Sequence, residues 1–123
     1  MGNFLFKLQI LLKAMQCLDN WHVFPLLYFG LIKKTHVWFK IKSGLKIKIR
    51  SNSTDLDTFS LIWILKEYDK HGFKIQKNDV VIDIGAHIGI FSLYASQNCT
   101  NGKILCYEPS IENYELLQHN ISE

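Results

Sequence analysis

Apolar residues recur every three or four positions over residues 3–19, and this spacing predicts an amphipathic helix at the start of the chain. Residues 21–32 are aromatic and irregular, and Pro25 and Gly30 interrupt them. A short helix or turn that packs against the rest of the chain is expected there. Residues 1–36 therefore form an N-terminal helical and aromatic segment.

A strict alternation follows this segment. Over residues 37–42 and 45–50, mainly aliphatic positions alternate with positions that are mostly lysine or arginine. This period of two predicts a β-hairpin with a two-residue turn at Ser43-Gly44. Because successive side chains of a strand point to opposite faces, one face of the hairpin is expected to be apolar and the other basic.

The rest of the chain predicts helices that alternate with strands. Such alternation is typical of α/β proteins with a parallel sheet, and residues 37–123 are expected to form one such domain. The expected elements are a helix that Ser53, Thr54 or Asp55 caps and that runs to about Tyr68, a strand over residues 80–84, a helix ending near Ser96, a strand over residues 103–107 and a last helix capped by Ser110.

The net charge of +3 conceals a basic segment between Lys33 and Arg50 that contains no Asp or Glu. A nucleic-acid or anionic-membrane surface is one interpretation, and the solvated face of the hairpin is the other. The alternation favours the second interpretation, so no nucleic-acid partner is expected.

The apolar runs within residues 1–32 are shorter than the ~20 residues that a spanning helix needs. Weak contact with a membrane surface stays open there as an alternative to core packing. The three cysteines include no C-x-x-C pair, which predicts a reduced, cytoplasmic protein, and no metal site is expected.

Candidate binding residues gather where the two predicted strands end. The first strand ends in Asp83 and Ile84, and a turn with Gly85, Ala86, His87 and Gly89 follows it. The second strand is followed by Glu108 and Pro109. A strand–turn–helix–strand unit with an acid at each strand end is typical of a site for an adenosine-containing cofactor.

The acid before the turn distinguishes between two cofactor classes. A nicotinamide-binding fingerprint has a middle glycine where this chain has His87, and its pyrophosphate would lie near the Asp83 carboxylate. S-adenosylmethionine has no phosphate and carries an ammonium and a sulfonium, which suit a neighbouring acid. Glu108 can accept hydrogen bonds from both ribose hydroxyls. His87 is expected to face the ligand with its backbone N–H, with general-base catalysis as the less favoured alternative.

The segment from Val80 to Gly89, followed by Phe91-Ser92-Leu93, Tyr107-Glu108-Pro109 and residues 113–120, resembles the FkbM-type family of S-adenosylmethionine-dependent methyltransferases. The resemblance implies a Rossmann-like class I methyltransferase fold, of which this chain holds the first half, through the second core strand and its helix. It implies O-methylation of a sugar or other small-molecule acceptor. The cofactor-binding residues that it implies are Asp83, Gly85, Ala86, His87, Gly89, Glu108 and Pro109, and it identifies no catalytic residue.

Two other functions stay open. The chain can be an inactive or split cofactor-binding module that pairs with another chain supplying the missing half. It can also be part of a nicotinamide-dependent oxidoreductase, although Asp83 and His87 count against this.

Overall fold

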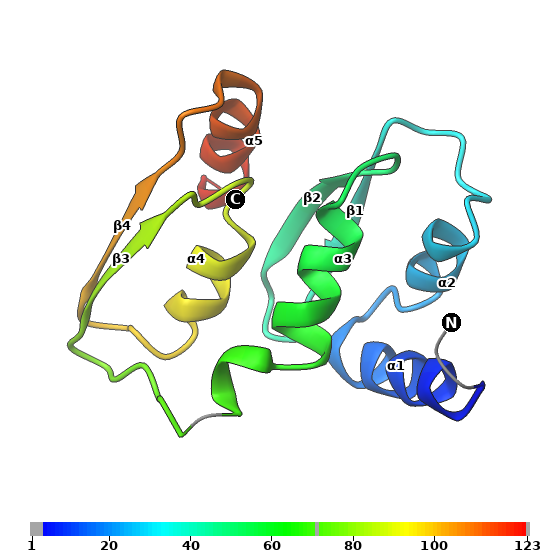
Figure 1. The fold of residues 1–123 in the computed structure, drawn as a ribbon, viewed down its shortest axis with the longest axis horizontal. Helices are drawn as coiled ribbons and strands as arrows, with labels where there is room; N and C mark the ends of the chain where they lie inside the picture. Colours follow the sequence, from blue (N-terminus) through cyan, green and yellow to red (C-terminus); the bar gives the residue numbers. More distant parts are fainter. Residues whose placement is uncertain (1–3, 71, 123) are drawn as a thin grey trace. The chain divides into compact units, whose positions relative to one another are not determined.

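The computed structural model describes residues 4–70 and 72–122, which form a mixed α/β structure (Figure 1). The chain divides into two compact units, Met1–Leu65 and Lys66–Glu123, and each unit has its own two-stranded sheet. The hairpin shares a unit with the N-terminal helices, whereas the sequence pattern groups it with the residues that follow.

Two helices begin the first unit. The apolar spacing predicts α1 (Phe4–Cys17), and α2 (Val23–Tyr28) lies in the segment where a short helix or turn is expected. Residue 3 of the predicted first helix lies outside the described residues. Between the helices, the Asn20 side chain bonds to the backbone of the hairpin. Its Nδ2 donates to the Trp38 carbonyl and its Oδ1 accepts from the Lys40 N–H, both at 2.8 Å. One side chain thereby ties the connection between the helices to the first strand.

The hairpin has the two faces that the alternation predicts. Strands β1 (His36–Lys40) and β2 (Lys46–Arg50) pair antiparallel, with Phe39 opposite Ile47. Both of these side chains are buried, whereas Lys40 and Lys46 are exposed. The apolar face therefore belongs to the core of the first unit.

The hairpin loop is longer than the predicted two-residue turn at Ser43-Gly44. The Ile41 N–H donates to the Leu45 carbonyl at 2.8 Å, and the Gly44 N–H donates to the Ile41 carbonyl at 2.9 Å. The loop therefore consists of residues 42–44, and Gly44 takes the left-handed position with φ +100°. This is the three-residue hairpin loop in which a turn is followed by a glycine bulge. The alternation predicts the faces correctly but not the loop length.

The helix after the hairpin ends earlier than predicted. α3 (Asp55–Phe59) continues as a π-helical turn, η1 (Ser60–Ile64), and Lys66 then adopts φ 51°. A left-handed residue reverses the backbone direction and ends a helix. Residues Glu67–Asp69 form a separate 3₁₀ turn, η2, so the predicted continuation to Tyr68 is wrong.

An ion pair between the partly exposed Arg50 and the buried Asp55 joins β2 to α3. The Asp55 side chain has no exposed surface and accepts hydrogen bonds from three donors of Arg50: the backbone N–H at 2.8 Å, Nε at 2.9 Å and Nη2 at 2.8 Å. The Asp55 N–H donates to Ser53 Oγ at 3.1 Å. The carboxylate thus fixes where the helix begins relative to the strand.

Four aromatic rings run through the core of the first unit. Phe24 of α2 lies 6.1 Å from Phe39 of β1, measured between ring centres. Phe39 lies 4.6 Å from Phe59 of α3, which lies 6.1 Å from Trp63 of η1. These contacts explain why the hairpin forms one unit with the helices before and after it.

The second unit is a strand–helix–strand–helix arrangement. β3 (Val80–Ile84) and β4 (Lys103–Tyr107) pair in parallel, with Asp83 opposite Cys106, and both strands have their predicted bounds. α4 (Ile90–Ser96) lies between them in the sequence, and α5 (Ile111–Ile121) follows β4. A Cβ on Gly102, before β4, would lie 1.9 Å from the Asp79 carbonyl oxygen, so this close approach requires glycine.

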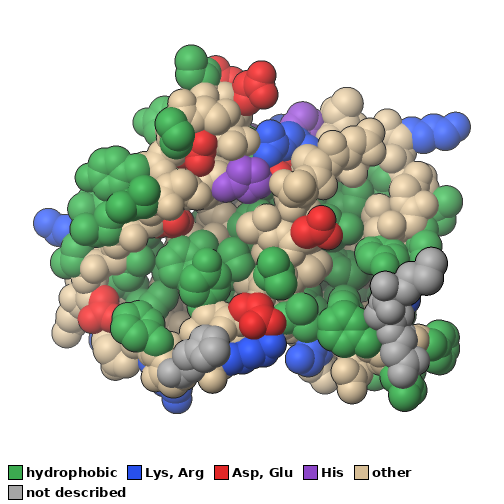
Figure 2. All heavy atoms as spheres, in the orientation of Figure 1, with side chains coloured by type: hydrophobic (Ala, Val, Ile, Leu, Met, Phe, Trp, Pro, Cys, Tyr) green, Lys and Arg blue, Asp and Glu red, His purple; other side chains and the backbone are tan. Residues whose placement is uncertain are grey.

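Among the described residues of the second unit, 66–70 and 72–122, helices cover one face of the β3–β4 pair. Figure 1 shows α4 and α5 on the same side of the pair. On the other face, hydrophobic side chains are exposed to solvent, up to 84% for Ile84, and they gather over the two strands in Figure 2. They are Val80, Ile82, Ile84, Leu105 and Tyr107. Parallel sheets normally have both faces covered.

Candidate functional site

The turn after β3 is anchored to the end of β4. The N–H groups of Gly85 and Ala86 both donate to the Tyr107 carbonyl, at 2.8 Å and 3.0 Å. Gly85 and Gly89 have positive φ angles of 79° and 86°, which glycine adopts at little steric cost. The predicted glycine turn therefore has the backbone conformation for which its glycines are suited.

His87 adopts a conformation that is unusual for its residue type. Its φ is 54°, a left-handed geometry that costs a non-glycine residue about 1–2 kcal/mol. The same geometry points its N–H at Glu108, and the N–H donates to Oε2 at 2.7 Å. The expectation that this N–H faces a ligand is therefore corrected, because the amide binds the acid of the neighbouring strand.

Three donors of the chain hold the Glu108 carboxylate. Besides His87, the Ser110 N–H donates to Oε1 at 2.9 Å, and Asn113 Nδ2 lies 3.4 Å from the same oxygen. The pKa of Glu108 lies below its ordinary value because the Ser110 N–H, followed by the His87 N–H and the Asn113 amide, favours the ionised form. Desolvation opposes this shift but does not outweigh it. The carboxylate is thus oriented and ionised at neutral pH.

α5 holds the turn and the acid together. The buried Asn120 side chain donates from Nδ2 to the Ile88 carbonyl at 2.9 Å. A Cβ on Gly89 would lie 3.5 Å from Leu117 Cγ, so the helix packs directly on the turn. Asn113, Leu117 and Asn120 are spaced four and three residues apart and so share one face of α5.

Sequence reasoning did not assign a role to Asn120. The available signal was a polar residue at helical spacing from buried Leu117, on the face of the helix that points inward. A buried amide at such a position normally has a hydrogen-bond partner in the fold. Ser110, expected to cap α5, occupies the cap position without a side-chain capping bond, and its backbone N–H binds Glu108 instead.

Asp83 lies apart from this cluster of hydrogen bonds. Its Oδ2 accepts from Ser92 Oγ of α4 at 2.5 Å, and Ser92 Oγ also lies 3.0 Å from Cys106 Sγ. The structure therefore connects Gly85, Ala86 and His87 to the end of β4, while Asp83 is bound to α4. Pro109 follows Glu108 and is exposed.

A hollow of about 960 Å³ runs along the edge of β3 that faces away from β4. Every residue of β3, including Asp83, contributes to its wall. Aromatic side chains close the far side: the rings of Tyr68 and Phe91 are 4.6 Å apart, and the Tyr94 hydroxyl donates to Asp69 Oδ2 at 2.6 Å. The hollow thus exposes a strand edge together with one of the predicted site residues.

Comparisons with known proteins give partial similarities. No family model matches the chain, and no solved structure matches it significantly. The chain is 38% identical over 48 residues to the methyltransferase sdnD of Sordaria araneosa, which is 39% of this chain and 18% of that protein. It is 30% identical over 60 residues to the AMB antimetabolite synthetase AmbE of Pseudomonas aeruginosa, which is 49% of this chain and 3% of that protein. The chain therefore spans less than a fifth of either relative and shows partial similarity to a methyltransferase.

Proposed function

We propose that the second unit is the cofactor-binding part of an S-adenosylmethionine-dependent methyltransferase, with a Rossmann-like class I fold similar to that of the FkbM-type family. One observation carries the proposal. Glu108, just after β4, is bonded to the glycine turn that follows the parallel strand β3. Ligands of open α/β sheets bind at this carboxyl edge. The partial similarity to a methyltransferase supports the proposal.

The turn suits this cofactor better than a dinucleotide. At Gly85 no atom lies within 4 Å of the position of a Cβ, so a ligand can approach the backbone there. The His87 N–H, which could otherwise bind a phosphate oxygen, already donates to Glu108. The carboxylates of Asp83 and Glu108 stand at the ends of the two strands. They would repel a pyrophosphate and attract a ligand that carries an ammonium and a sulfonium.

Glu108 is the residue we assign to the ribose. An ionised carboxylate offers about four acceptor positions, and donors of the chain use three of them, the one to Asn113 at a long 3.4 Å. A ribose hydroxyl can use the remaining position and replace the long bond. The other residues assigned to the cofactor wall are Asp83, Gly85, Ala86, His87, Gly89 and Pro109.

When bound, the cofactor would supply an electrophilic methyl group on its sulfur. The proposed acceptor is a hydroxyl group of a sugar or other small molecule, and this class rests on the family resemblance. The second unit contributes binding and orientation of the cofactor to this reaction. No residue of the chain is assigned to catalysis.

The open face and edge of β3 support a second proposal about how the site is completed. Its outward side chains are exposed, and the hollow along its free edge is lined by every residue of the strand. An exposed apolar strand edge is a surface on which another strand can pair. We propose that further polypeptide, from the same protein or from a partner chain, extends this sheet and adds the acceptor site.

The cofactor assignment can be tested by NMR titration of the chain with S-adenosylhomocysteine and, separately, with NADH. S-adenosylhomocysteine is expected to shift the amide resonances of Gly85 and Gly89, and NADH is expected to leave them unchanged. Glu108→Gln should weaken the binding of S-adenosylhomocysteine about tenfold, because it replaces a charged hydrogen-bond acceptor with a neutral amide. Glu112→Gln, an exposed change in the first turn of α5, is the matched control. A preference for NADH, or equal affinities of the two variants, would contradict the assignment.

A further inference from the structure

α1 exposes most of its apolar side chains. Of its 14 residues only Ala14 is buried, and Phe4 is 77% exposed. Figure 2 shows hydrophobic side chains along this helix. The exposed large apolar residues of α1 are Phe4, Leu5, Phe6, Leu8, Leu12 and Met15. Core packing, the expectation to which membrane contact was the alternative, therefore does not account for these side chains.

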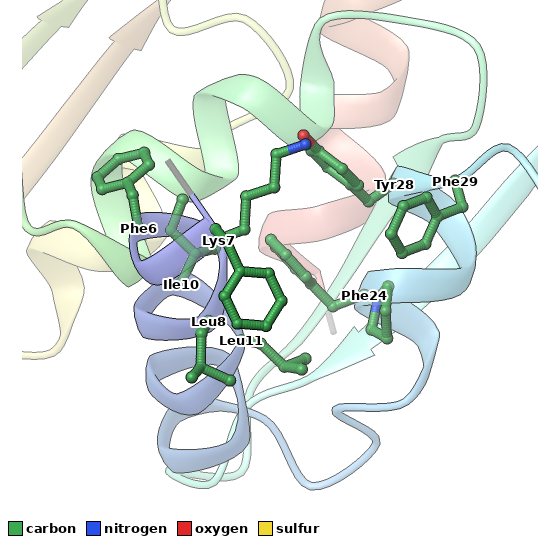
Figure 3. Close-up of a pocket in the computed structure, with 10 residues that line it drawn as sticks. Phe6, Lys7, Leu8, Ile10, Leu11, Phe24, Tyr28 and Phe29 are labelled. Carbon is green, nitrogen blue, oxygen red and sulfur yellow. The ribbon is translucent and has the colours of Figure 1, made fainter. Parts of the chain in front are cut away.

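The neighbouring α2 continues this surface. Leu26 and Tyr28 of α2 and Phe29 and Leu31 after it are exposed. Between the two helices lies an open apolar pocket of about 320 Å³ (Figure 3). The side chain of Lys7 extends from α1 toward α2, where its Nζ lies 5.9 Å from the centre of the Tyr28 ring. We call these exposed residues of α1, α2 and the segment to Leu31 the α1–α2 surface.

Positive charge accompanies the α1–α2 surface. Residues 4–54 contain nine Lys and Arg residues and a single acid, Asp19. Lys7 and Lys13 belong to α1 and are exposed, and Lys33 and Lys34 follow the surface directly. An apolar surface with lysines around it is complementary to a lipid bilayer, which has anionic headgroups at its surface and an apolar interior.

We propose that the α1–α2 surface docks on an anionic lipid bilayer, with its aromatic and aliphatic side chains inserted at the level of the headgroups. Within residues 4–70 and 72–122, no helix is long and apolar enough to cross a membrane. α1, with 14 residues, is about 21 Å long, against a hydrocarbon core of about 30 Å. The helix therefore lies in the interface.

Other occupants fit the surface less well. A second copy of the chain would bring Lys7 and Lys13 against the same lysines, and Asp19 is the one acid of that region available to pair with them. A protein groove takes one apolar stripe of a helix, whereas consecutive Phe4, Leu5 and Phe6 point in different directions around α1. Fluid lipid accommodates such a surface.

The proposal can be tested by co-sedimentation of the chain with phosphatidylcholine vesicles that contain or lack phosphatidylserine. Binding is expected to be stronger with phosphatidylserine and to weaken as salt is added. Phe4→Asp or Phe29→Asp should reduce the partition coefficient about tenfold. Phe73→Asp is the matched control, because Phe73 belongs to the second unit and is 76% exposed, close to the 77% of Phe4.

Lys7→Gln combined with Lys13→Gln should weaken binding to the anionic vesicles, with circular dichroism unchanged because both lysines are exposed. This variant tests the proposal even where an aspartate disturbs α1. Absence of vesicle binding, or an equal loss with Phe73→Asp, would overturn the proposal. A lipid-free dimer that Phe4→Asp dissociates would also overturn it, since a second copy would then cover the surface.

Discussion

Replacing Asn120 by leucine tests whether α5 fixes the conformation of the glycine turn. The Asn120 side chain is 1% exposed, and its Nδ2 donates to the Ile88 carbonyl at 2.9 Å. Leucine has the same number and branching of heavy atoms as asparagine and a higher helix propensity, so the change should leave α5 itself intact. It removes the donor, and the buried carbonyl of Ile88 loses this hydrogen bond.

Removing one partner of a buried hydrogen bond costs about 1–3 kcal/mol, mainly because the other group stays desolvated. The gain in helix propensity offsets a few tenths of this. We therefore expect Asn120→Leu to lower the free energy of unfolding of the second unit by about 1–3 kcal/mol. For a unit of this size, each 1 kcal/mol corresponds to about 4–8 °C in Tm.

Urea denaturation followed by circular dichroism would measure this loss, and amide NMR spectra would show whether residues 85–89 change conformation. Gln118→Leu is the matched control, because Gln118 is an exposed amide of the same helix that bonds to the Tyr114 hydroxyl at 3.1 Å. The control should stay within about 0.5 kcal/mol of the parent. Equal stability of both variants, or unchanged turn resonances in Asn120→Leu, would refute the role of α5.

Two further predictions concern charged groups. Asp55→Asn should destabilise the first unit by about 1.5–3 kcal/mol, since it replaces the buried carboxylate that accepts three hydrogen bonds from Arg50 with a neutral amide. The exposed Asp57→Asn should change the stability by less than about 0.5 kcal/mol, and equal losses in denaturation experiments would contradict the role of the ion pair. The Glu108 carboxyl should titrate below its ordinary pKa of 4.5 in NMR experiments. Because the folded pKa is lowered, its contribution to stability is present above the unfolded pKa and is lost as the pH falls through the folded pKa. Glu108→Gln should remove this contribution to the pH dependence of the free energy of unfolding. A titration midpoint of the Glu108 carboxyl at or above 4.5 would count against the hydrogen bonds described.

The alternation of apolar and polar residues was enough to predict the hairpin, and short apolar runs were enough to predict the two parallel strands. Val80–Ile84 and Lys103–Tyr107 have their predicted bounds, and the hairpin has its predicted faces. Such patterns record which side of a strand is buried. They do not record backbone conformation, so the three-residue loop at Gly44 was missed. Lysine carries no signal for the left-handed conformation that Lys66 adopts, so the helix end was misplaced.

The candidate site was predicted in part. The sequence indicates a glycine turn and Glu108 at neighbouring strand ends, and the structure brings Gly85, Ala86 and His87 to the end of β4. It does not indicate that the His87 N–H is directed at Glu108, because a positive φ at histidine depends on the tertiary partner. The bond from Asp83 to Ser92 likewise requires the packing of α4 on the sheet. Whether these residues bind a cofactor stays a prediction.

The bond between Asn120 and Ile88 has a consequence for how the protein is made. The two residues are 32 positions apart, so the ribosome synthesises the turn well before the side chain that fixes it. At about 5–20 residues per second, translation separates the two events by roughly 2–6 s. During this interval the turn after β3 exists without α5, so the Ile88 carbonyl lacks the Asn120 side chain that bonds to it. The synthesis of α5 thus sets the earliest time at which this turn can acquire the conformation described.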